Sequence, residues 1–389
     1  MQQLHFPQLM AILVMLVIFG PMGIDIFLPS FTVIEDYFNT TADHVQYTLS
    51  LFILSMGLCQ LIAGPMIDKY GRRRVVLVGI ALYGATALLG AMAQSINMLI
   101  IARVLQGASA CCTTTVAFAV VRDIFSTRES AQAYSYLNGA LNISPALAPM
   151  IGGFLGTVFS WQASFLFMAT FAVVAFVVVW FKLPETQPPK SENPSLSIAD
   201  SYKVLLTNSE FMINTLFGLG AMAFIISYVS FAPQLLIGQL GLSEAVFSLL
   251  FGANALGIMV SSVLAGRYMH ALGENGCTLI GCLLMTVGAV GMLTGYWLHG
   301  VTVAGFIIPV MAASAGFAWL LGATTGKAIA GFSHIAGTAS ALLVCIQMLG
   351  AALISILIQA SPSPVLINLA VLMAIAGLLP LIPFFFKKR

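Results

Sequence analysis

Of the 389 residues in this chain, 60% are hydrophobic and only 7% are charged. A soluble globule of this length needs far more polar surface, so the composition excludes a soluble protein and predicts an integral membrane protein. The formal net charge of +2 comes from basic residues spread along the chain, which argues against a nucleic-acid partner.

Apolar stretches of membrane-spanning length repeat along the whole chain. A helix rises about 1.5 Å per residue, so roughly 20 apolar residues cross a hydrocarbon core of about 30 Å. We therefore predict an all-α membrane protein with twelve transmembrane helices. They span residues 8–32, 44–67, 75–93, 97–121, 130–158, 163–181, 211–233, 245–266, 277–297, 301–323, 334–359 and 365–386.

The basic residues indicate how these helices are oriented. Lys and Arg are retained in short loops on the cytoplasmic side of a membrane. Fourteen of the fifteen basic residues follow even-numbered predicted helices, and none follows an odd-numbered one. Both termini are therefore expected in the cytoplasm.

A polar segment divides the predicted helices into two sets of six. Pro, Ser, Asn and charged residues concentrate within residues 183–210, which predicts a cytoplasmic linker. The chain would then consist of an N-terminal six-helix bundle at 1–182 and a C-terminal six-helix bundle at 211–389.

The two halves share short sequence patterns. Gly64 and Gly71, after the second helix, recur as Gly266 and Gly273 after the eighth, at the same spacing. A Phe-X-Pro pattern near the end of the first helix recurs near the end of the seventh. Two pseudo-symmetric six-helix bundles around a central site are typical of alternating-access transporters.

Several motifs are similar to signatures of one transporter family. Residues 64–74 resemble the family's signature after the second helix, 99–107 that of the fourth helix, and 139–153 the antiporter signature of the fifth helix. Leu183–Thr186, after the sixth helix, is a further match. With these motifs, nearly the whole chain resembles the major facilitator superfamily (MFS). Within it the chain resembles the drug:proton antiporter branch with twelve spans and the Bcr/CflA multidrug resistance transporters.

The first of these motifs implies a conformational gate. The resemblance pairs Arg72 with an acidic residue just after the fourth helix, here Asp123. Glycines allow a tight turn, and charges can part and pair again as two halves rock. We expect an exposed pair, worth under about 1 kcal/mol. The alternative is basic charge that only sets the topology. The gate candidates are Gly64, Asp68, Gly71, Arg72, Arg122 and Asp123.

The fifth-helix motif implies a hinge. Small residues let helices approach closely, and prolines remove backbone hydrogen bonds, so a bend or soft point is expected there. Two glycines of the family pattern are replaced, by Ser144 and Ala148. Ordinary small-residue packing is the alternative. The hinge candidates are Ser144, Pro145, Pro149, Gly152 and Gly153.

Asp25 and Arg103 are the only charged residues inside the predicted spans. A charge at bilayer depth is costly and persists mainly where it pairs, lines a polar cavity or moves protons. Counting residues places Asp25 roughly 10 Å and Arg103 roughly 9 Å below the same outer surface, so we expect them to share one cavity. Burial favours a neutral carboxyl and a nearby arginine favours a charged one, so small rearrangements could switch its protonation.

The fourth-helix resemblance implies a part for the buried arginine in proton coupling. Gln106 lies one turn after Arg103 and can hydrogen-bond nearby. The proton-coupling candidates are thus Asp25, Arg103 and Gln106. The alternative for Arg103 is a structural tie to backbone carbonyls, and both roles could coexist.

A cavity for amphiphilic ligands should be apolar and aromatic with a few polar groups. Aromatic pairs at helical spacing are more often packing than binding, so packing stays the alternative for these residues. The candidates for substrate binding are Met22, Asn142, Phe224, Tyr228, Phe251, Asn254 and Gln347.

Together these patterns predict a monomeric, multi-pass protein of the bacterial inner membrane. The resemblance implies efflux of drugs or other amphiphilic small molecules by proton antiport, driven by the proton gradient without a cofactor. Transport of a physiological metabolite by the same fold is the alternative. No nucleophile–base pair, metal-ligand cluster or nucleotide-binding loop is evident in the sequence, so an enzyme, a channel and an ATP-driven pump are disfavoured.

Overall fold

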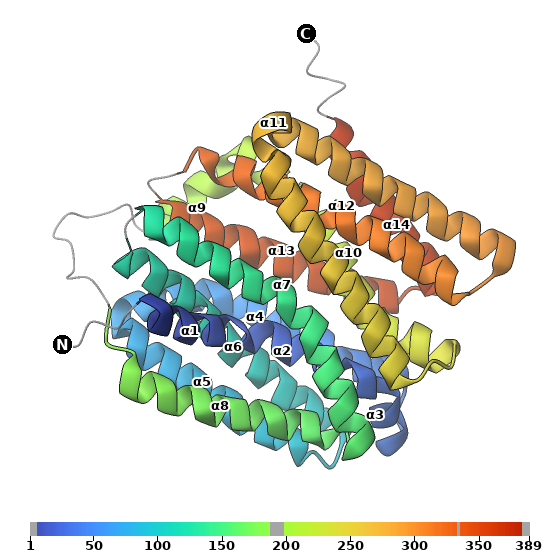
Figure 1. Ribbon diagram of the computed structural model, residues 1–389, viewed down its shortest axis with the longest axis horizontal. Helices are drawn as coiled ribbons and strands as arrows, with labels where there is room; N and C mark the ends of the chain where they lie inside the picture. The colour runs from blue at the N-terminus through green and yellow to red at the C-terminus, as the bar shows by residue number, and fades with distance from the viewer. Residues whose placement is uncertain (1–5, 126, 187–197, 333–334, 383–389) are drawn as a thin grey trace, which may run out of the picture. The chain divides into compact units, whose positions relative to one another are not determined.

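The computed structural model describes residues 6–125, 127–186, 198–332 and 335–382. Helices make up nearly all of this part, and no strand occurs in it (Figure 1). The chain divides into two compact units, unit 1 at Met1–Glu192 with Ser243–Gly252 and unit 2 at Asn193–Leu242 with Ala253–Arg389.

Unit 1 is a bundle centred on α6, which packs against α4 and α5, while α5 also packs against α8. The first predicted span is present as several short pieces that contact α6 and α7. The elements of unit 1 are α1 (Phe6–Val17), α2 (Phe19–Asp25), η1 (Leu28–Ser30), α3 (Phe31–Tyr37), α4 (Ala42–Tyr70), α5 (Arg72–Ala91), α6 (Ile96–Ile124), α7 (Thr127–Val158) and α8 (Gln162–Lys182).

Unit 2 is a second bundle, in which α10 packs against α12, α13 and α14. The helix α11 (Glu244–His299) begins in unit 1 and reverses direction at Gly273, where the backbone φ is 65° (Figure 1). The other elements are α9 (Ile198–Thr207), α10 (Ser209–Pro233), η2 (Gln234–Gln239), α12 (Val303–Ala330), α13 (Ala336–Gln359), α14 (Val365–Leu378) and η4 (Leu379–Leu381).

Ten helical segments of the described residues are long and apolar enough to cross a membrane. Two further apolar segments, Ile143–Val158 and Val365–Leu381, are shorter. The predicted count of twelve spans, the cytoplasmic termini and the bundle boundaries at 182 and 211 therefore stay predictions.

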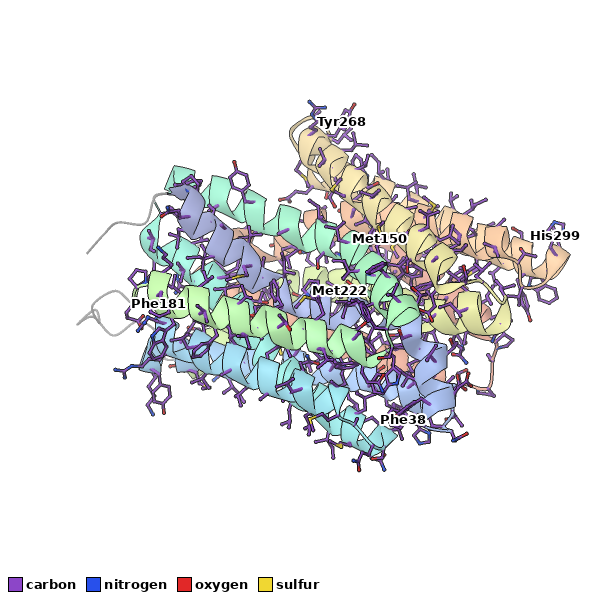
Figure 2. All side chains as sticks on the ribbon, turned by 60° about the horizontal axis from the view of Figure 1, so that its bottom comes forward. Phe38, Met150, Phe181, Met222, Tyr268 and His299 are labelled. Atoms are coloured by element: carbon purple, nitrogen blue, oxygen red, sulfur yellow. The ribbon has the colours of Figure 1, made fainter. Side chains whose placement is uncertain are left out.

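The outer surface of the helices is apolar, as a hydrocarbon solvent requires. Phe181, at the end of α8, is 76% exposed, and Trp297, near the end of α11, is 79% exposed. Carbon-rich side chains cover the helices, with Phe181 projecting from α8 (Figure 2). Exposed apolar surface on this scale is not found on soluble monomers.

The predicted linker contains a helix that the sequence analysis did not anticipate. Part of it, residues 187–197, lies outside the described residues. The remainder forms α9, which packs on α10 and α13 and buries Leu205 completely. The ten residues of α9 form one short amphipathic helix inside an otherwise polar segment, so the sequence pattern did not reveal it.

The first predicted span is not one continuous helix. It breaks at Ile18, between α1 and α2, and again after Asp25, before the short η1 turn. Pro21 and Pro29 lie four residues after Val17 and Asp25, and a proline lacks the N–H that would bond the carbonyl four residues before it. The breaks therefore follow from the two prolines and place Asp25 at the end of a helical piece.

The helix α7 packs directly on the second of these breaks. A methyl group added at Gly152 would overlap the backbone carbonyl of Ile26. Only glycine lets the two backbones come this close, and overpacking a close contact costs about 1–3 kcal/mol.

We therefore expect Gly152→Ala to lower the thermal unfolding temperature of the purified protein. Gly322→Ala is the matched control, because a methyl group there meets no atom within 4 Å. A fluorescence-monitored melt in detergent measures both, and equal melting of the two variants would contradict this packing.

Candidate functional site

Asp25 is buried in the interior of unit 1. Asp25 is only 3% exposed and lies at the C-terminal end of α2. Within the described part of the chain, its carboxylate has no hydrogen-bond or ion-pair partner. An acidic group that is buried without a partner is favoured in its neutral form, so this position suits a carboxyl that takes up a proton.

Arg103 is also completely buried, and it holds the broken first span in place. Its guanidinium donates to Gln106 Oε1 at 2.6 Å and to the backbone carbonyl of Gly23. The Gly23 carbonyl lies in the short helix that ends at Asp25. A carbonyl beside a helix break inside a membrane protein needs such an internal donor.

Aromatic rings enclose the same guanidinium. It lies 4.4 Å from the ring centre of Phe27, 4.2 Å from that of Phe52 and 5.9 Å from that of Phe165. These rings come from the first span, α4 and α8. Cation–π contacts of a desolvated arginine contribute about 2 kcal/mol or more. Through these contacts Arg103, itself in α6, links four segments of unit 1.

The cavity that the two buried charges are expected to share stays a prediction. The depth agrees with the prediction, because Arg103 contacts Gly23, two residues from Asp25. However, the described residues contain no ion pair between Arg103 and Asp25. Two nitrogens of the guanidinium donate to an amide and a carbonyl, and aromatic rings lie around it, while Nε has no hydrogen-bond partner among the described residues. These contacts are those of the alternative interpretation, a structural tie.

Tyr83 of α5 belongs to the same interior cluster and was missed by the sequence analysis. Its hydroxyl donates to the carbonyl of Phe19 at 3.1 Å, and the two rings meet edge to face at 4.8 Å. A methyl group added at Gly23 would lie 3.0 Å from this hydroxyl. A single tyrosine amid an apolar span was the available signal, because a buried hydroxyl needs a partner.

The predicted contact of Arg72 with Asp123 is present. Arg72 Nε lies 2.7 Å from Asp123 Oδ2, and other guanidinium nitrogens lie 3.0 Å from Asp68 Oδ1 and from the carbonyl oxygen of Ile67. The pair was expected to be exposed, and this was wrong, because the side chains of Arg72 and Asp123 are only 3% and 4% exposed. Removing one partner of a buried pair costs about 3–5 kcal/mol, far more than an exposed pair contributes.

Gly71 is the whole connection between α4 and α5. The predicted spans leave residues 68–74 between them, whereas α4 continues to Tyr70 and α5 begins at Arg72. Gly71 has a φ of 92°, which favours glycine, and a side chain there would also strike the Glu185 carboxylate. The tight turn predicted for this glycine is thus observed, whereas a methyl group at Gly64 would meet no atom within 4 Å.

Glu185 completes this cluster, and its role was missed. Its carboxylate accepts hydrogen bonds from the backbone N–H groups of Arg72 at 2.8 Å and Arg73 at 3.2 Å. These N–H groups begin α5 and have no partner within the helix, and a negative charge is favoured there. In the sequence, Glu185 stands out only as part of the Leu183–Thr186 match.

Arg122 is peripheral to the cluster. Its Nε lies 3.6 Å from Asp123 Oδ1, and its side chain is 54% exposed. Exposed pairs of this kind contribute little.

The hinge candidates lie in α7, which runs through both prolines without interruption. Ser144 is buried, and the carbonyl of Pro149 accepts a hydrogen bond from the Ser248 hydroxyl at 3.0 Å, also within unit 1. A methyl group at Gly153 would lie 2.6 Å from the same hydroxyl. These contacts describe close packing, and the bend stays a prediction.

The substrate-binding candidates are divided between the units. Met22 and Phe251 are buried in unit 1, while Phe224, Tyr228, Asn254 and Gln347 are buried in unit 2. The side chain of Asn142 lies outside the described part of the structure.

Some of these candidates pack as aromatic pairs, as the alternative interpretation holds. The Phe251 ring lies 5.6 Å from that of Phe247, and the Tyr228 ring lies 6.2 Å from that of Phe306. By contrast, Asn254 Oδ1 and Gln347 Nε2 are buried without a hydrogen-bond partner among the described residues. Such amides can bind a polar group of a ligand.

Comparison with known proteins decides the family. The model of the Major Facilitator Superfamily matches residues 12–355. The chain belongs to this superfamily. It is therefore a transporter and not an enzyme, and MFS transporters generally use ion gradients without a cofactor.

Curated relatives of this MFS chain include drug-resistance proteins. A chloramphenicol resistance protein of Pseudomonas aeruginosa is 30% identical over 357 residues, which cover 89% of this chain and 83% of the relative. Multidrug resistance protein D of Escherichia coli is 30% identical over 377 residues, covering 95% and 93%. An uncharacterized MFS-type transporter of Bacillus subtilis, YdgK, is 32% identical over 353 residues, covering 88% and 86%.

Solved structures share the fold of this MFS chain. A D-xylose–proton symporter gives a TM-score of 0.79 at 13% identity, covering 95% of this chain and 96% of that one. The E. coli xylose transporter XylE, in a partially occluded inward open conformation, gives 0.76 at 13% identity, covering 98% and 97%. The predicted MFS fold and the location as a multi-pass protein of the bacterial inner membrane are thus confirmed.

We expect Arg72→Ala to destabilise the protein by about 3–5 kcal/mol, because it leaves the buried Asp123 with only the 3.6 Å contact to the exposed Arg122. The double variant Arg72→Met with Asp123→Leu should recover much of this loss, since it leaves no isolated charge. Thermal melts of both variants in detergent test this. A double variant that melts below Arg72→Ala would speak against a buried pair.

For Arg103→Lys we expect a loss of about 2 kcal/mol although the positive charge is kept. An ammonium cannot bond Gly23 and Gln106 as a planar fork while it stacks between two rings. The melting temperature of the variant is the measurement, with Arg267→Lys as a control at an exposed arginine. Equal melting of the Arg103 variant and the native protein would show that charge alone matters at this position.

Proposed function

We propose that this MFS transporter exports drugs or other amphiphilic small molecules across the bacterial inner membrane in exchange for protons. Alternating access of a central cavity would move the substrate outward and protons inward. The observation that carries the proposal is the carboxylate of Asp25, which is buried in unit 1 and has no partner among the described residues, in a chain whose relatives include proteins named for drug resistance.

The relatives support the substrate class. Two of them at 30% identity are named for chloramphenicol or multidrug resistance, and each match extends over most of both chains. Closer assignment to the Bcr/CflA group rests on shorter sequence matches, such as Leu183–Thr186. A ligand cavity with few polar groups suits amphiphilic substrates.

Proton coupling is supported by the environment of Asp25. A carboxyl with no donor beside it is neutral when shielded, and it releases its proton when water or a cationic group reaches it. The helix break after Asp25 lets the carboxyl move without bending a continuous helix. Gln106 and Arg103 would act indirectly, by holding the short helix that carries Asp25.

The Arg72 cluster supports a gate. Three segments meet Arg72 of α5 there, since α4 supplies Asp68, α6 supplies Asp123, and Glu185 follows α8. A change of conformation that separated these segments would break the buried ion pair. Hydration of the newly exposed charges would then offset part of the lost pairing energy. The gate would thus have two discrete states rather than a continuum.

Substrate recognition would use the buried amides of unit 2. Asn254 offers an acceptor and Gln347 a donor, both without partners among the described residues. Phe224 and Tyr228 would supply apolar walls. The amides would then bind a hydroxyl or amide of the substrate, and the rings its apolar part.

Transport of a physiological metabolite is the alternative, and it is compatible with the same fold. One structural relative is a D-xylose–proton symporter, and its 13% identity supports the fold alone. The direction of coupling and the substrate must therefore be measured together.

Asp25→Asn should abolish proton-driven efflux, because an amide keeps the size of the side chain but cannot bind and release a proton. Everted membrane vesicles, energised to acidify their lumen, would be assayed for uptake of radiolabelled chloramphenicol. Asp36→Asn is the matched control, since Asp36 is an exposed carboxylate of the same segment.

Several outcomes distinguish the possibilities. Retained gradient-dependent uptake in Asp25→Asn vesicles would overturn the role of Asp25. Uptake by the native protein that no uncoupler reduces would overturn antiport itself. A panel of sugars and amino acids in the same vesicles would reveal a metabolite carrier by competition.

A further inference from the structure

An apolar groove lies at the surface of unit 1, and its lining includes none of the buried charged residues Asp25, Arg72 and Arg103. It has a volume of about 470 Å³, within the range of about 300–1,000 Å³ that small-molecule sites occupy. The groove lies between α4, α5 and α6. Its walls include Ile62, Met66, Val78, Leu82, Leu105 and Ala108.

The groove opens toward the surrounding membrane. Ile62, Val78 and Leu82, on its rim, are 57%, 56% and 52% exposed. An occupant that enters from this side comes out of the hydrocarbon of the bilayer. It must therefore be a lipid or a solute dissolved in lipid.

The few polar groups in the groove are already bonded to the helices that carry them. The Ser109 hydroxyl donates to the carbonyl of Gln106 at 2.8 Å, and the Thr86 hydroxyl donates to that of Leu82 at 2.8 Å. The Cys111 thiol donates to the carbonyl of Ala108 at 3.2 Å. Along its length the groove thus offers only apolar contact, which suits a hydrocarbon chain better than a drug with polar groups.

A positive charge lies at one end of the groove. Arg74 and Tyr70 line this end, and both side chains are exposed. Arg72 is bound by carboxylates, and Arg73 donates to the Trp180 carbonyl at 2.6 Å. Arg74, by contrast, has no hydrogen-bond or ion-pair partner within the described residues.

The distribution of basic residues assigns this end of the groove to the cytoplasmic leaflet. That leaflet carries anionic lipids, and basic sites beside transmembrane helices attract their headgroups.

We propose that the groove is a binding site for an anionic phospholipid, with one acyl chain between α4, α5 and α6 and the phosphate at Arg74. The phosphate oxygens would accept hydrogen bonds from the guanidinium fork, and the Tyr70 hydroxyl would donate to the same headgroup. A zwitterionic lipid would fill the groove but lack the net charge that Arg74 selects. The bound lipid would stabilise the packing of α4, α5 and α6.

The test is lipid titration of the purified full-length protein by native mass spectrometry. Phosphatidylglycerol and phosphatidylcholine with identical acyl chains are the probes. We expect tighter binding of phosphatidylglycerol, and a drop in its affinity of about fivefold in Arg74→Gln, the effect of one basic residue near a membrane surface. Phosphatidylcholine binding should not change in that variant.

Two further variants complete the test. Arg267→Gln removes an exposed arginine that lies outside the groove, and should leave both lipids unaffected. Ala108→Phe fills the groove without a change of charge, and should weaken both lipids. Melting temperatures equal to that of the native protein verify that each variant is folded.

Other outcomes would overturn the proposal. Equal affinity of the native protein for the two lipids, or an Arg74→Gln variant that binds phosphatidylglycerol as the native protein does, would exclude a headgroup site at Arg74. Displacement of the bound lipid by chloramphenicol, prevented in Ala108→Phe, would make the groove a substrate site instead.

Discussion

The interaction on which unit 1 depends is the bond from the Arg103 guanidinium to the carbonyl of Gly23. Prolines break the helix of the first span on either side of Gly23, and a membrane interior supplies no water to bond a carbonyl beside a break. Arg103 supplies the donor from α6 and is itself enclosed by Phe27, Phe52 and Phe165. The broken span, and with it the position of Asp25, is therefore held by a charge that serves structure first.

Two sets of buried charges in unit 1 differ in how they are compensated. Arg72 and Asp123 compensate each other, and further hydrogen bonds occupy the remaining guanidinium nitrogens. Asp25 has no such compensation among the described residues. A compensated pair resists change until the helices that carry it separate, whereas an isolated carboxyl responds to any cation or water that arrives. The proposed gate and the proposed proton carrier therefore differ in how their charges are compensated, and not only in sequence position.

The sequence predicted what depends on composition and spacing along one helix. The spans, the depth shared by Asp25 and Arg103, and the contact of Arg72 with Asp123 all follow from apolar runs, residue counts or a motif. The partners of Arg103, the burial of Arg72 and the cap that Glu185 forms on α5 depend on which segments pack together. Residues 113 positions apart, such as Arg72 and Glu185, leave no periodic pattern. The helix α9 was hidden for another reason, because its ten residues are too few to stand out in a polar segment.

The repeated turn shows how far the duplication extends. Gly71 and Gly273 both adopt positive φ, at 92° and 65°, so the backbone of the turn is kept in each half. The charge that follows the turn is not kept, because Arg72 follows the first glycine and Glu274 follows the second. The charge near the end of the following helix also changes sign, from Asp123 in α6 to Lys327 in α12. Lys327 donates to Asn275 at 2.8 Å and to Thr278 at 3.2 Å. Among the described residues, the buried ion pair at such a turn therefore lies in unit 1, the unit that also carries Asp25.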